Sequence, residues 1–504
     1  MALPKEVYQA LESVVGPEWI SDDPAILEAD HVGGGAHGAA NIKRPACSMQ
    51  PETAEEVHGI VKLCNKYKLP FSATTTNPPP GMERDGVVYI DLKRMRKLEI
   101  DEDNLYATLE PGVSFAALQG ELFKRGLVTF VPMCGGNVSV LANTLNVGEG
   151  AISYRYGDRG YRRVLGTEWV TAGGDILRIG SCAANKDDYF WGEGPGPDLR
   201  GLMASANLES PTTRGICTKM GVRVFPFVEE AMVPEGDAPM TDLILPSNRF
   251  KYYNFVFPTK EAAINAIYEI GKCEIGLFVM TVPPWFFAMA RARGSAEVLT
   301  GAAGFWDYWD NHEAPIIREN PNQTTCRALL YGIGSDKRLA YEEKVLMDIC
   351  EEFGTTFAKA SRRTTDETHF MSSDAIVSNL AGGRFTSVIL FESLDHAFKC
   401  GDIVNKNTRK HVPPVLDDYG TTNWFLPFEM CHICKLECLR FASVEDAGEL
   451  ALLMDDCHKD FVDVGAFPVR PAAERYGPKW ENYPEKTRKF KKLLDPNDLA
   501  PPIT

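Results

Sequence analysis

The chain has 504 residues, of which 44% are hydrophobic and 24% are charged, and its formal net charge is −16. This acidity disfavours nucleic-acid binding and docking on an anionic membrane, because both need clustered Lys and Arg. The length exceeds what one hydrophobic core usually serves, so it predicts two or three domains.

The N-terminus and the cysteines indicate a cytoplasmic protein. Lys5 and Glu6 stand near the start, without the apolar stretch of a secretory signal. The longest uncharged apolar run, residues 275–290, is too short to span a bilayer, and Pro283 and Pro284 interrupt it. The 13 cysteines are scattered and odd in number, which is typical of reduced thiols and not of a disulfide framework. We therefore expect no membrane span.

Residues 45–110 have an α/β pattern. Thr53 and Glu56 form a capping box at the start of a predicted helix. The apolar stripe of this helix comprises Val57, Ile60, Val61 and Cys64. Strands are predicted at residues 71–76, 87–92 and 105–109. Ser114 is expected to cap a further helix that carries Phe115 and Leu118.

Residues 131–160 are rich in glycine, which lets a backbone approach a ligand closely. The glycines of this segment are Gly135, Gly136, Gly148, Gly150, Gly157 and Gly160. We expect the segment to line a binding site. Further along, Gly173 and Gly174 separate two apolar segments and predict a β-hairpin.

The composition changes after Pro226, where helix and strand patterns alternate and aromatic residues become frequent. These aromatic residues include Trp285, Phe286, Phe287, Phe305, Trp306, Tyr308 and Trp309. The change predicts a domain boundary near residue 228. The tail from about residue 460 returns to Gly, Pro and basic residues.

Four sequence blocks carry a resemblance to a known family. They are Arg44-Pro45 with residues 51–57, residues 109–113, residues 139–145 followed by Tyr156-Gly157-Asp158, and residues 215–219. The C-terminal Leu-Asp-Pro-Asn at residues 494–497 also fits. In this order and spacing, the chain resembles the FAD-linked oxidoreductases of the vanillyl-alcohol oxidase and p-cresol methylhydroxylase family. The resemblance covers roughly the first 228 residues and the C-terminal end.

The resemblance implies an α+β fold in two parts. Residues 1–228 would form an FAD-binding domain of the p-cresol methylhydroxylase (PCMH) type, and residues 229–459 an α/β cap domain that holds the substrate. The tail, residues 460–504, would return to the FAD-binding domain.

The cofactor that the resemblance implies is FAD. Hydroxyl and amide donors for its pyrophosphate would come from Thr74, Thr75, Thr76 and Asn77. The family's loop is usually glycine-rich, whereas residues 78–80 here are prolines without an N–H group. The resemblance places further cofactor contacts at Gly135, Gly136, Asn143, Gly148, Tyr156, Gly215 and Ile216. For any one of these glycines a plain turn is the alternative, and Tyr156 could equally lie on the surface.

Two residues are candidates for the catalytic centre. Cys134 stands where the resemblance places the Asp that phenol-oxidising members have near the flavin, and one phenol-binding Tyr falls among the loop prolines. Arg470 resembles the family's substrate-binding Arg, although Val469 replaces the neighbouring Tyr. An Arg binds a carboxylate bidentately, but a salt bridge is the alternative role. These departures disfavour a 4-alkylphenol substrate.

His432 is a third candidate, in a segment whose pattern predicts a cap-domain strand. The resemblance implies that a His on this strand can bond covalently to the 8α carbon of the flavin. A hydrogen-bonded histidine in the core is the alternative, and it would leave the FAD dissociable.

Cys431, Cys434 and Cys438 have the Cys-x2-Cys spacing of an iron–sulfur site. On a strand, however, the side chain of Cys431 would face away from the other two, because successive side chains alternate between faces. We therefore interpret the three as packed apolar residues and expect no metal.

The sequence thus predicts an FAD-dependent oxidase or dehydrogenase. It would take a hydride from a small alcohol, hydroxy acid or benzylic carbon onto flavin N5, and the cap aromatics and Arg470 favour an aromatic or carboxylate-bearing substrate. A reductase that uses reduced nicotinamide and a flavin subunit with an electron-transfer protein as partner stay open as alternatives. We expect a homo-oligomer, and the sequence names neither the substrate nor the electron acceptor.

Overall fold

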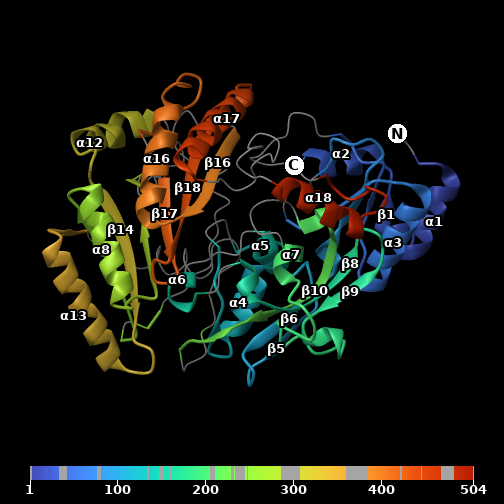
Figure 1. Ribbon diagram of the computed structural model, residues 1–504, viewed down its shortest axis with the longest axis horizontal. Coiled ribbons are helices and arrows are strands. Elements are labelled where there is room, and N and C mark those ends of the chain that lie inside the picture. The colour runs from blue at the N-terminus through green and yellow to red at the C-terminus, as the bar shows by residue number, and fades with distance from the viewer. Residues whose placement is uncertain are drawn as a thin grey trace.

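A computed structural model describes residues 3–32, 43–76, 81–132, 136–146, 152–157, 160–204, 211–228, 232, 245–246, 248–284, 307–358, 384–419, 423–443, 445–466 and 482–502. The strands β1–β11 lie within residues 20–226 and the strands β12–β18 within residues 250–442. The two groups form the right and left halves of Figure 1. Among the described residues, no strand of one group pairs with a strand of the other.

The first sheet is mixed and has the order β1-β2-β4-β3. Its strands are β1 (Ile20–Ser21), β2 (Cys47–Met49), β3 (Phe71–Thr74) and β4 (Val88–Asp91). Parallel pairs join β2 to β4 and β3 to β4. Helix α3 (Ala54–Tyr67) connects β2 to β3, and its buried stripe is the one that the sequence predicts. The Thr53 hydroxyl accepts a hydrogen bond from the Glu56 N–H, which confirms the N-cap.

The second sheet is antiparallel and has the order β5-β6-β10-β8-β9. Its strands are β5 (Leu98–Asp101), β6 (Tyr106–Leu109), β8 (Val164–Thr171), β9 (Ile176–Ile179) and β10 (Gly215–Arg223). The hairpin of β8 and β9 turns at Gly173 and Gly174, as predicted. A short pair joins β7 (Leu127–Val128) to β11 (Phe225–Pro226).

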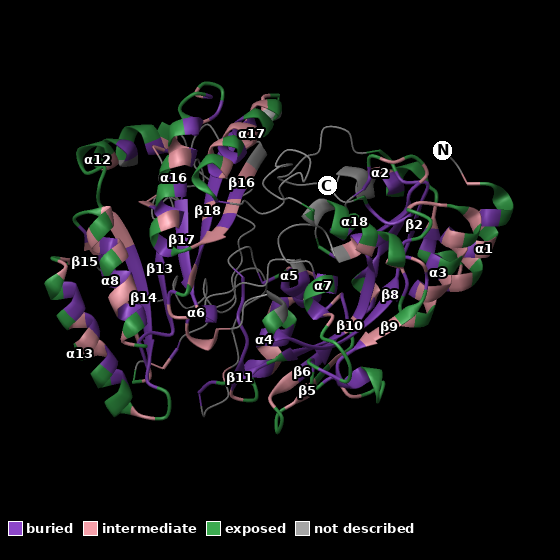
Figure 2. Cartoon of the chain, viewed as in Figure 1, coloured by how far each residue is buried: buried purple, intermediate pink, exposed green. Residues whose placement is uncertain are grey.

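The second group of strands forms two antiparallel sheets, in the orders β13-β14-β12-β15 and β16-β18-β17. Their strands are β12 (Phe250–Phe257), β13 (Phe278–Thr281), β14 (Thr324–Tyr331), β15 (Thr356–Ala358), β16 (Arg384–Glu392), β17 (Asn423–Phe428) and β18 (Ile433–Ala442). Four helices pack on these sheets and expose their outer faces (Figure 2). They are α8 (Lys260–Lys272), α13 (Asp336–Glu352), α16 (Leu394–Thr408) and α17 (Ala447–Val464).

The remaining helices are mostly short. They are α1 (Lys5–Val15), α2 (Pro24–Val32), α4 (Phe115–Phe123), α5 (Val140–Asn146), α6 (Ser153–Tyr156), α7 (Arg200–Ala204), α12 (Ala314–Glu319) and α18 (Tyr483–Leu494). Ser114 caps α4 by accepting a hydrogen bond from the Ala117 N–H, as predicted. None of the helices in the described ranges combines the length and apolarity that a membrane crossing requires.

The chain's C-terminal helix lies with the first group of strands. Helix α18 packs beside the sheet of β8 and β10 (Figure 1), and the Gly173 N–H donates to the Leu494 carbonyl. The mixture of helices and sheets confirms the predicted α+β class. The exact domain limits at residues 228 and 459 stay predictions.

A buried ion pair holds helix α6 against the second group of strands. Arg155 of α6 donates to the Glu342 carboxylate of α13 over 2.7 Å, and the side chains are 10% and 0% exposed. The same carboxylate accepts from Arg338 and from the Gly276 N–H. Arg155 also donates to the Gly276 carbonyl. Glu342 is therefore fully hydrogen-bonded although no water reaches it.

The variant Glu342→Gln should destabilise the protein, because it leaves the Arg155 guanidinium buried without its anion. Loss of one partner of a buried pair typically costs about 3–5 kcal/mol. The measurement is urea unfolding followed by circular dichroism. Asp348→Asn is the matched control on the same helix, since its ion pair with Lys344 is exposed and worth about 0.5 kcal/mol or less. Equal unfolding midpoints for the two variants would contradict a structural role of the buried pair.

Candidate functional site

The threonines at the end of β3 lie against the segment before α5. Thr75 is buried, Thr74 is half-buried and Thr76 is exposed. The Thr76 hydroxyl accepts a hydrogen bond from the Ser139 N–H over 3.2 Å. This contact brings the threonine segment next to the glycine-rich segment, as the resemblance requires.

Ser139 connects three segments, and no sequence signal marked it as a site residue. Besides the bond to Thr76, its hydroxyl donates to the Pro111 carbonyl over 2.6 Å and accepts from the Ala142 N–H over 3.1 Å. Asn143 of α5 is buried, and its N–H donates to the Ser139 carbonyl. A buried hydroxyl with this many partners could have been found only from the fold.

Gly136 lies at the start of the same segment. It is buried, and its carbonyl accepts from the Ala116 N–H of α4 over 2.6 Å. This bond fixes the backbone between α4 and Ser139.

Helix α6 carries Tyr156, which contacts β11. The Tyr156 ring stacks on Phe225 with 4.3 Å between the ring centroids, and burial raises the pKa of its hydroxyl above the usual value. The half-buried ring therefore packs against β11. The alternative of a surface position for Tyr156 is therefore wrong, and its contact with the cofactor stays a prediction.

Gly215 and Ile216 begin β10. Gly215 has φ = 151°, and a Cβ atom there would lie 2.4 Å from the Val170 carbonyl oxygen, so a larger residue does not fit. Ile216 is buried and pairs with Val170 of β8. Thr213, two residues before the strand, is also buried.

Buried hydroxyls without a partner mark these same segments. Among the described residues, the buried Ser and Thr hydroxyls that make no hydrogen bond belong to Thr75, Thr144, Ser153 and Thr213. One follows β3, one lies on α5, one on α6 and one before β10. An unsatisfied buried hydroxyl costs about 1–3 kcal/mol, so hydroxyls retained at these four positions indicate contact with a polar ligand.

These segments fit FAD by their chemistry. Neutral hydroxyls and glycine backbone suit a long ligand whose ribityl chain, ribose and pyrophosphate all need hydrogen bonds. The residues that would hold it are Thr75, Thr144, Ser153, Thr213 and the backbone near Gly136. Asn77, Cys134, Gly135, Gly148 and Arg470 lie outside the described residues, so their roles stay predictions.

The predicted strand position of His432 is wrong. His432 lies in the turn between β17 and β18, and its side chain is exposed. The preceding residues Glu429, Met430 and Cys431 all have left-handed backbone conformations, with φ of 50°, 51° and 69°. The strand pattern of the sequence hid this turn because no glycine or proline marks it. The alternative role of His432, a buried histidine in the core, is also wrong, because the side chain is exposed.

The turn before His432 nevertheless contacts α6. The N–H groups of Glu429 and Met430 donate to the carbonyls of Ser153 and Tyr154 over 3.1 Å and 2.8 Å. Glu429 also forms an ion pair with Arg162. The covalent role of His432 itself stays untested.

The three clustered cysteines are packed thiols. Cys431 is in the turn and not on a strand, and its thiol donates to the Ile267 carbonyl. Burial raises the pKa of Cys431 to about 12 and raises the pKa values of Cys434 and Cys438 strongly. In the described part of the chain, no group of three or more His, Cys, Asp or Glu side chains is arranged to hold a metal ion.

A cleft of about 1300 Å³ lies in the other half of the molecule. Its described lining comes from residues 254–425, and none of the predicted cofactor residues contributes to it. A substrate that reacts at a flavin must lie beside the flavin, so this cleft is not the site that the threonines and glycines define.

Comparison with known proteins identifies the class. Residues 45–180 match the model of the FAD binding domain. The structure of p-cresol methylhydroxylase with substrate bound superposes with a TM-score of 0.73 at 19% identity, covering 99% of this chain and 95% of that one. The chain therefore contains an FAD binding domain and has the PCMH-type fold. The resemblance seen in the sequence is confirmed.

Two curated relatives give the chemical context. The 4-cresol dehydrogenase [hydroxylating] flavoprotein subunit of Pseudomonas putida is 26% identical over 291 residues, 53% of this chain and 52% of the relative. A D-lactate dehydrogenase of Archaeoglobus fulgidus is 26% identical over 230 residues, 44% of each chain. The matches thus span about half the length of these relatives.

The cysteine environments predict slow thiol modification in the folded protein. Native protein treated with iodoacetamide near neutral pH should label Cys273 well before Cys434 and Cys438. Burial raises the pKa of all three thiols, but Cys273 is partly exposed, whereas Cys434 and Cys438 are fully buried and their pKa values are raised most. Peptide mass spectrometry measures the order, and unfolded protein serves as the control. Rapid labelling of Cys434 in the native state would contradict the packed arrangement.

Proposed function

We propose that the protein is an FAD-dependent oxidoreductase that oxidises a small alcohol, hydroxy acid or benzylic carbon. The observation that carries the proposal is the set of four unpartnered buried Ser and Thr hydroxyls. Three of them lie within residues 45–180, which match the FAD binding domain model, and Thr213 precedes β10, which pairs with β8 of that range. The relatives support the reaction class, since they are described as a 4-cresol and a D-lactate dehydrogenase.

Bound FAD would supply hydride acceptance at N5, and the chain would supply binding and orientation. Thr75, Thr144, Ser153 and Thr213 would donate to or accept from the polar atoms of the cofactor. Ser139 would act as a positioning residue, because it fixes the Thr76 backbone segment against α5. The ordered segments would bind the cofactor without needing to refold.

The substrate would lie between the FAD-binding part, residues 1–228 with the tail 460–504, and the cap, residues 229–459. Arg470 would hold a carboxylate or a polarised oxygen of the substrate, and Cys134 would face the flavin where phenol-oxidising relatives have an Asp. A cysteine there offers no carboxylate base, so a hydroxy acid or alcohol fits this chain better than a 4-alkylphenol.

A second candidate is a flavin subunit that passes electrons to another protein. The description of the Pseudomonas putida relative as a flavoprotein subunit favours it. The two candidates differ in the electron acceptor and share the cofactor site.

The variant Thr75→Val should weaken FAD binding while leaving the flavin-free protein as stable as the wild type or more so. The reason is that the hydroxyl has no partner without cofactor, so its removal relieves a desolvation cost of about 1–3 kcal/mol. We expect about a tenfold rise in the Kd for FAD, measured by flavin fluorescence, and no fall in the melting temperature of the flavin-free form.

The matched control is Thr408→Val in the other half of the molecule. The Thr408 hydroxyl donates to the Val404 carbonyl and accepts from Arg440, so this variant should lose stability and keep its FAD affinity. A Thr75→Val protein that loses stability without FAD and binds FAD normally contradicts the assignment.

Anaerobic mixing of the FAD-loaded protein with candidate substrates tests the reaction. We expect a 2-hydroxy acid or a primary alcohol to bleach the visible absorbance of the flavin faster than a 4-alkylphenol of similar size. Bleaching by reduced nicotinamide alone would identify the chain as a reductase and contradict the proposed direction.

We propose that the FAD is held without a covalent bond to His432, because the strand position on which that linkage depended is wrong. After acid precipitation, the flavin should be in the supernatant. Flavin that stays with the pellet, and moves to the supernatant in His432→Ala, would establish the linkage instead.

A further inference from the structure

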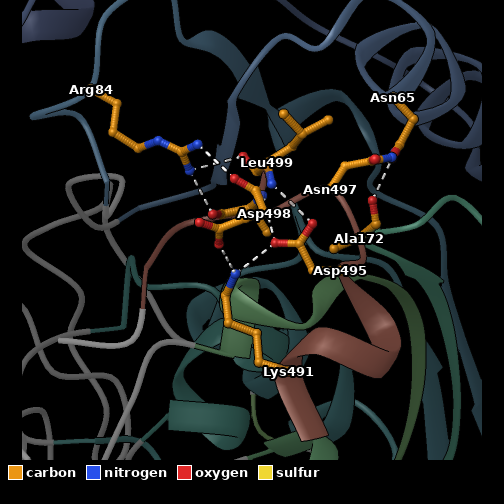
Figure 3. A network of polar contacts seen from close by, with 9 residues as sticks. Asn65, Arg84, Ala172, Lys491, Asp495, Asn497, Asp498 and Leu499 are labelled. Carbon is orange, nitrogen blue, oxygen red and sulfur yellow. Dashed lines mark hydrogen bonds and ion pairs between the residues drawn. The ribbon is translucent and has the colours of Figure 1, made fainter. Parts of the chain in front are cut away.

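The C-terminal segment after α18 folds back on the first sheet around one buried carboxylate. Asp495 accepts hydrogen bonds from Lys491 over 2.6 Å and from the N–H groups of Leu499 and Ala500 over 2.9 Å and 3.1 Å (Figure 3). Lys491 is buried and also donates to Asp498, which keeps the pKa of Asp498 below its usual value. These bonds give residues 495–500 one fixed conformation.

The segment holds the chain on both sides of Thr75. Before Thr75, the Phe71 N–H at the start of β3 donates to the Leu499 carbonyl over 3.0 Å. After it, the Arg84 guanidinium donates to the carbonyls of Asp498, Leu499 and Ala500 over 2.7, 3.3 and 2.8 Å (Figure 3).

Gly81 completes the contact. It has φ = 76°, and a Cβ atom there would lie 3.1 Å from Pro501. The tail thus lies directly against residue 81, where only glycine combines this conformation with so close an approach.

A separate set of contacts joins the tail to α3 and to the turn between β8 and β9. Asn497 donates to the Asn65 side chain over 2.7 Å and accepts from Lys68 over 2.6 Å. Asn65 in turn donates to the Ala172 carbonyl over 2.9 Å. These contacts hold the tail on the molecule but do not involve Thr75 or its flanking residues.

We propose that the C-terminal segment, residues 491–501, is a positioning element for the cofactor, and that Arg84 is the residue through which it holds the Thr75 segment in its binding conformation. The inference rests on the proposed function, since it concerns the affinity for FAD. Arg84 touches no reacting atom. Its three bonds to tail carbonyls order the flanking chain before FAD binds. FAD binding then does not have to supply the entropic cost of ordering that chain.

The test is titration of flavin-free protein with FAD, followed by flavin fluorescence, for the wild type and three variants. Arg84→Leu should raise the Kd for FAD about tenfold or more, and Arg84→Lys should give an intermediate value because an ammonium group cannot reach three carbonyls at once. Asn497→Ala, which removes tail contacts away from Thr75, should leave the Kd near that of the wild type. Circular dichroism and the melting temperature of each flavin-free variant establish that it is folded.

Each result decides the matter. An unchanged Kd in folded Arg84→Leu overturns the role of the tail and leaves the proposed function intact. An equal weakening in Asn497→Ala and Arg84→Leu also overturns it, because the tail would then act only through overall stability. A wild-type chain that binds no FAD contradicts the proposed function itself and the inference with it.

Discussion

The ion pair of Arg155 and Glu342 fixes helix α6, which follows the glycine-rich segment in sequence, against the second group of strands. The carboxylate is fully buried, and every partner it has comes from a different place: α6, the backbone of Gly276, and Arg338 of its own helix. A buried charge of this kind is stable only with its partners in place. Helix α6 is therefore fixed relative to the second group of strands, and with it the Ser153 hydroxyl of the candidate cofactor site.

The unpartnered hydroxyls of the cofactor segments lower the stability of the flavin-free protein. Thr75, Thr144, Ser153 and Thr213 bury hydroxyls that no protein atom satisfies. In a structural core, such positions would favour Val or Ala. Functional sites commonly keep residues that lower stability because those residues bind a ligand, and the hydroxyls here fit that pattern. Ser139 and the C-terminal segment supply the rigidity that lets these hydroxyls keep their positions.

Local sequence signals predicted local structure well. The Thr53 cap, the apolar stripe of α3 and the Gly173-Gly174 hairpin all depend on residues within a few positions of one another, so they could be read directly. The order of the four blocks then indicated the FAD-binding fold. His432 was misplaced because strand-like residues run through a tight turn that three left-handed residues make without glycine.

Contacts between distant residues could not be predicted in this way. Glu342 lies 187 positions from Arg155, and nothing in either helix pattern distinguishes it from the half-buried Glu343 or the exposed Glu351 of the same helix. The role of Arg84 is similar, since its partners are backbone carbonyls near the other end of the chain. Contacts of this kind depend on the tertiary structure. The sequence indicated that structure only through its resemblance to a known family, which does not specify individual contacts.

The most direct test of the central claim is hydrogen exchange measured by mass spectrometry, with and without FAD. The account predicts that FAD slows exchange in the peptides that contain Thr75, Thr144, Ser153 and Thr213. It predicts no change in residues 316–325, which line the cleft in the other half of the molecule. Protection confined to that cleft, or no protection at all, would contradict it.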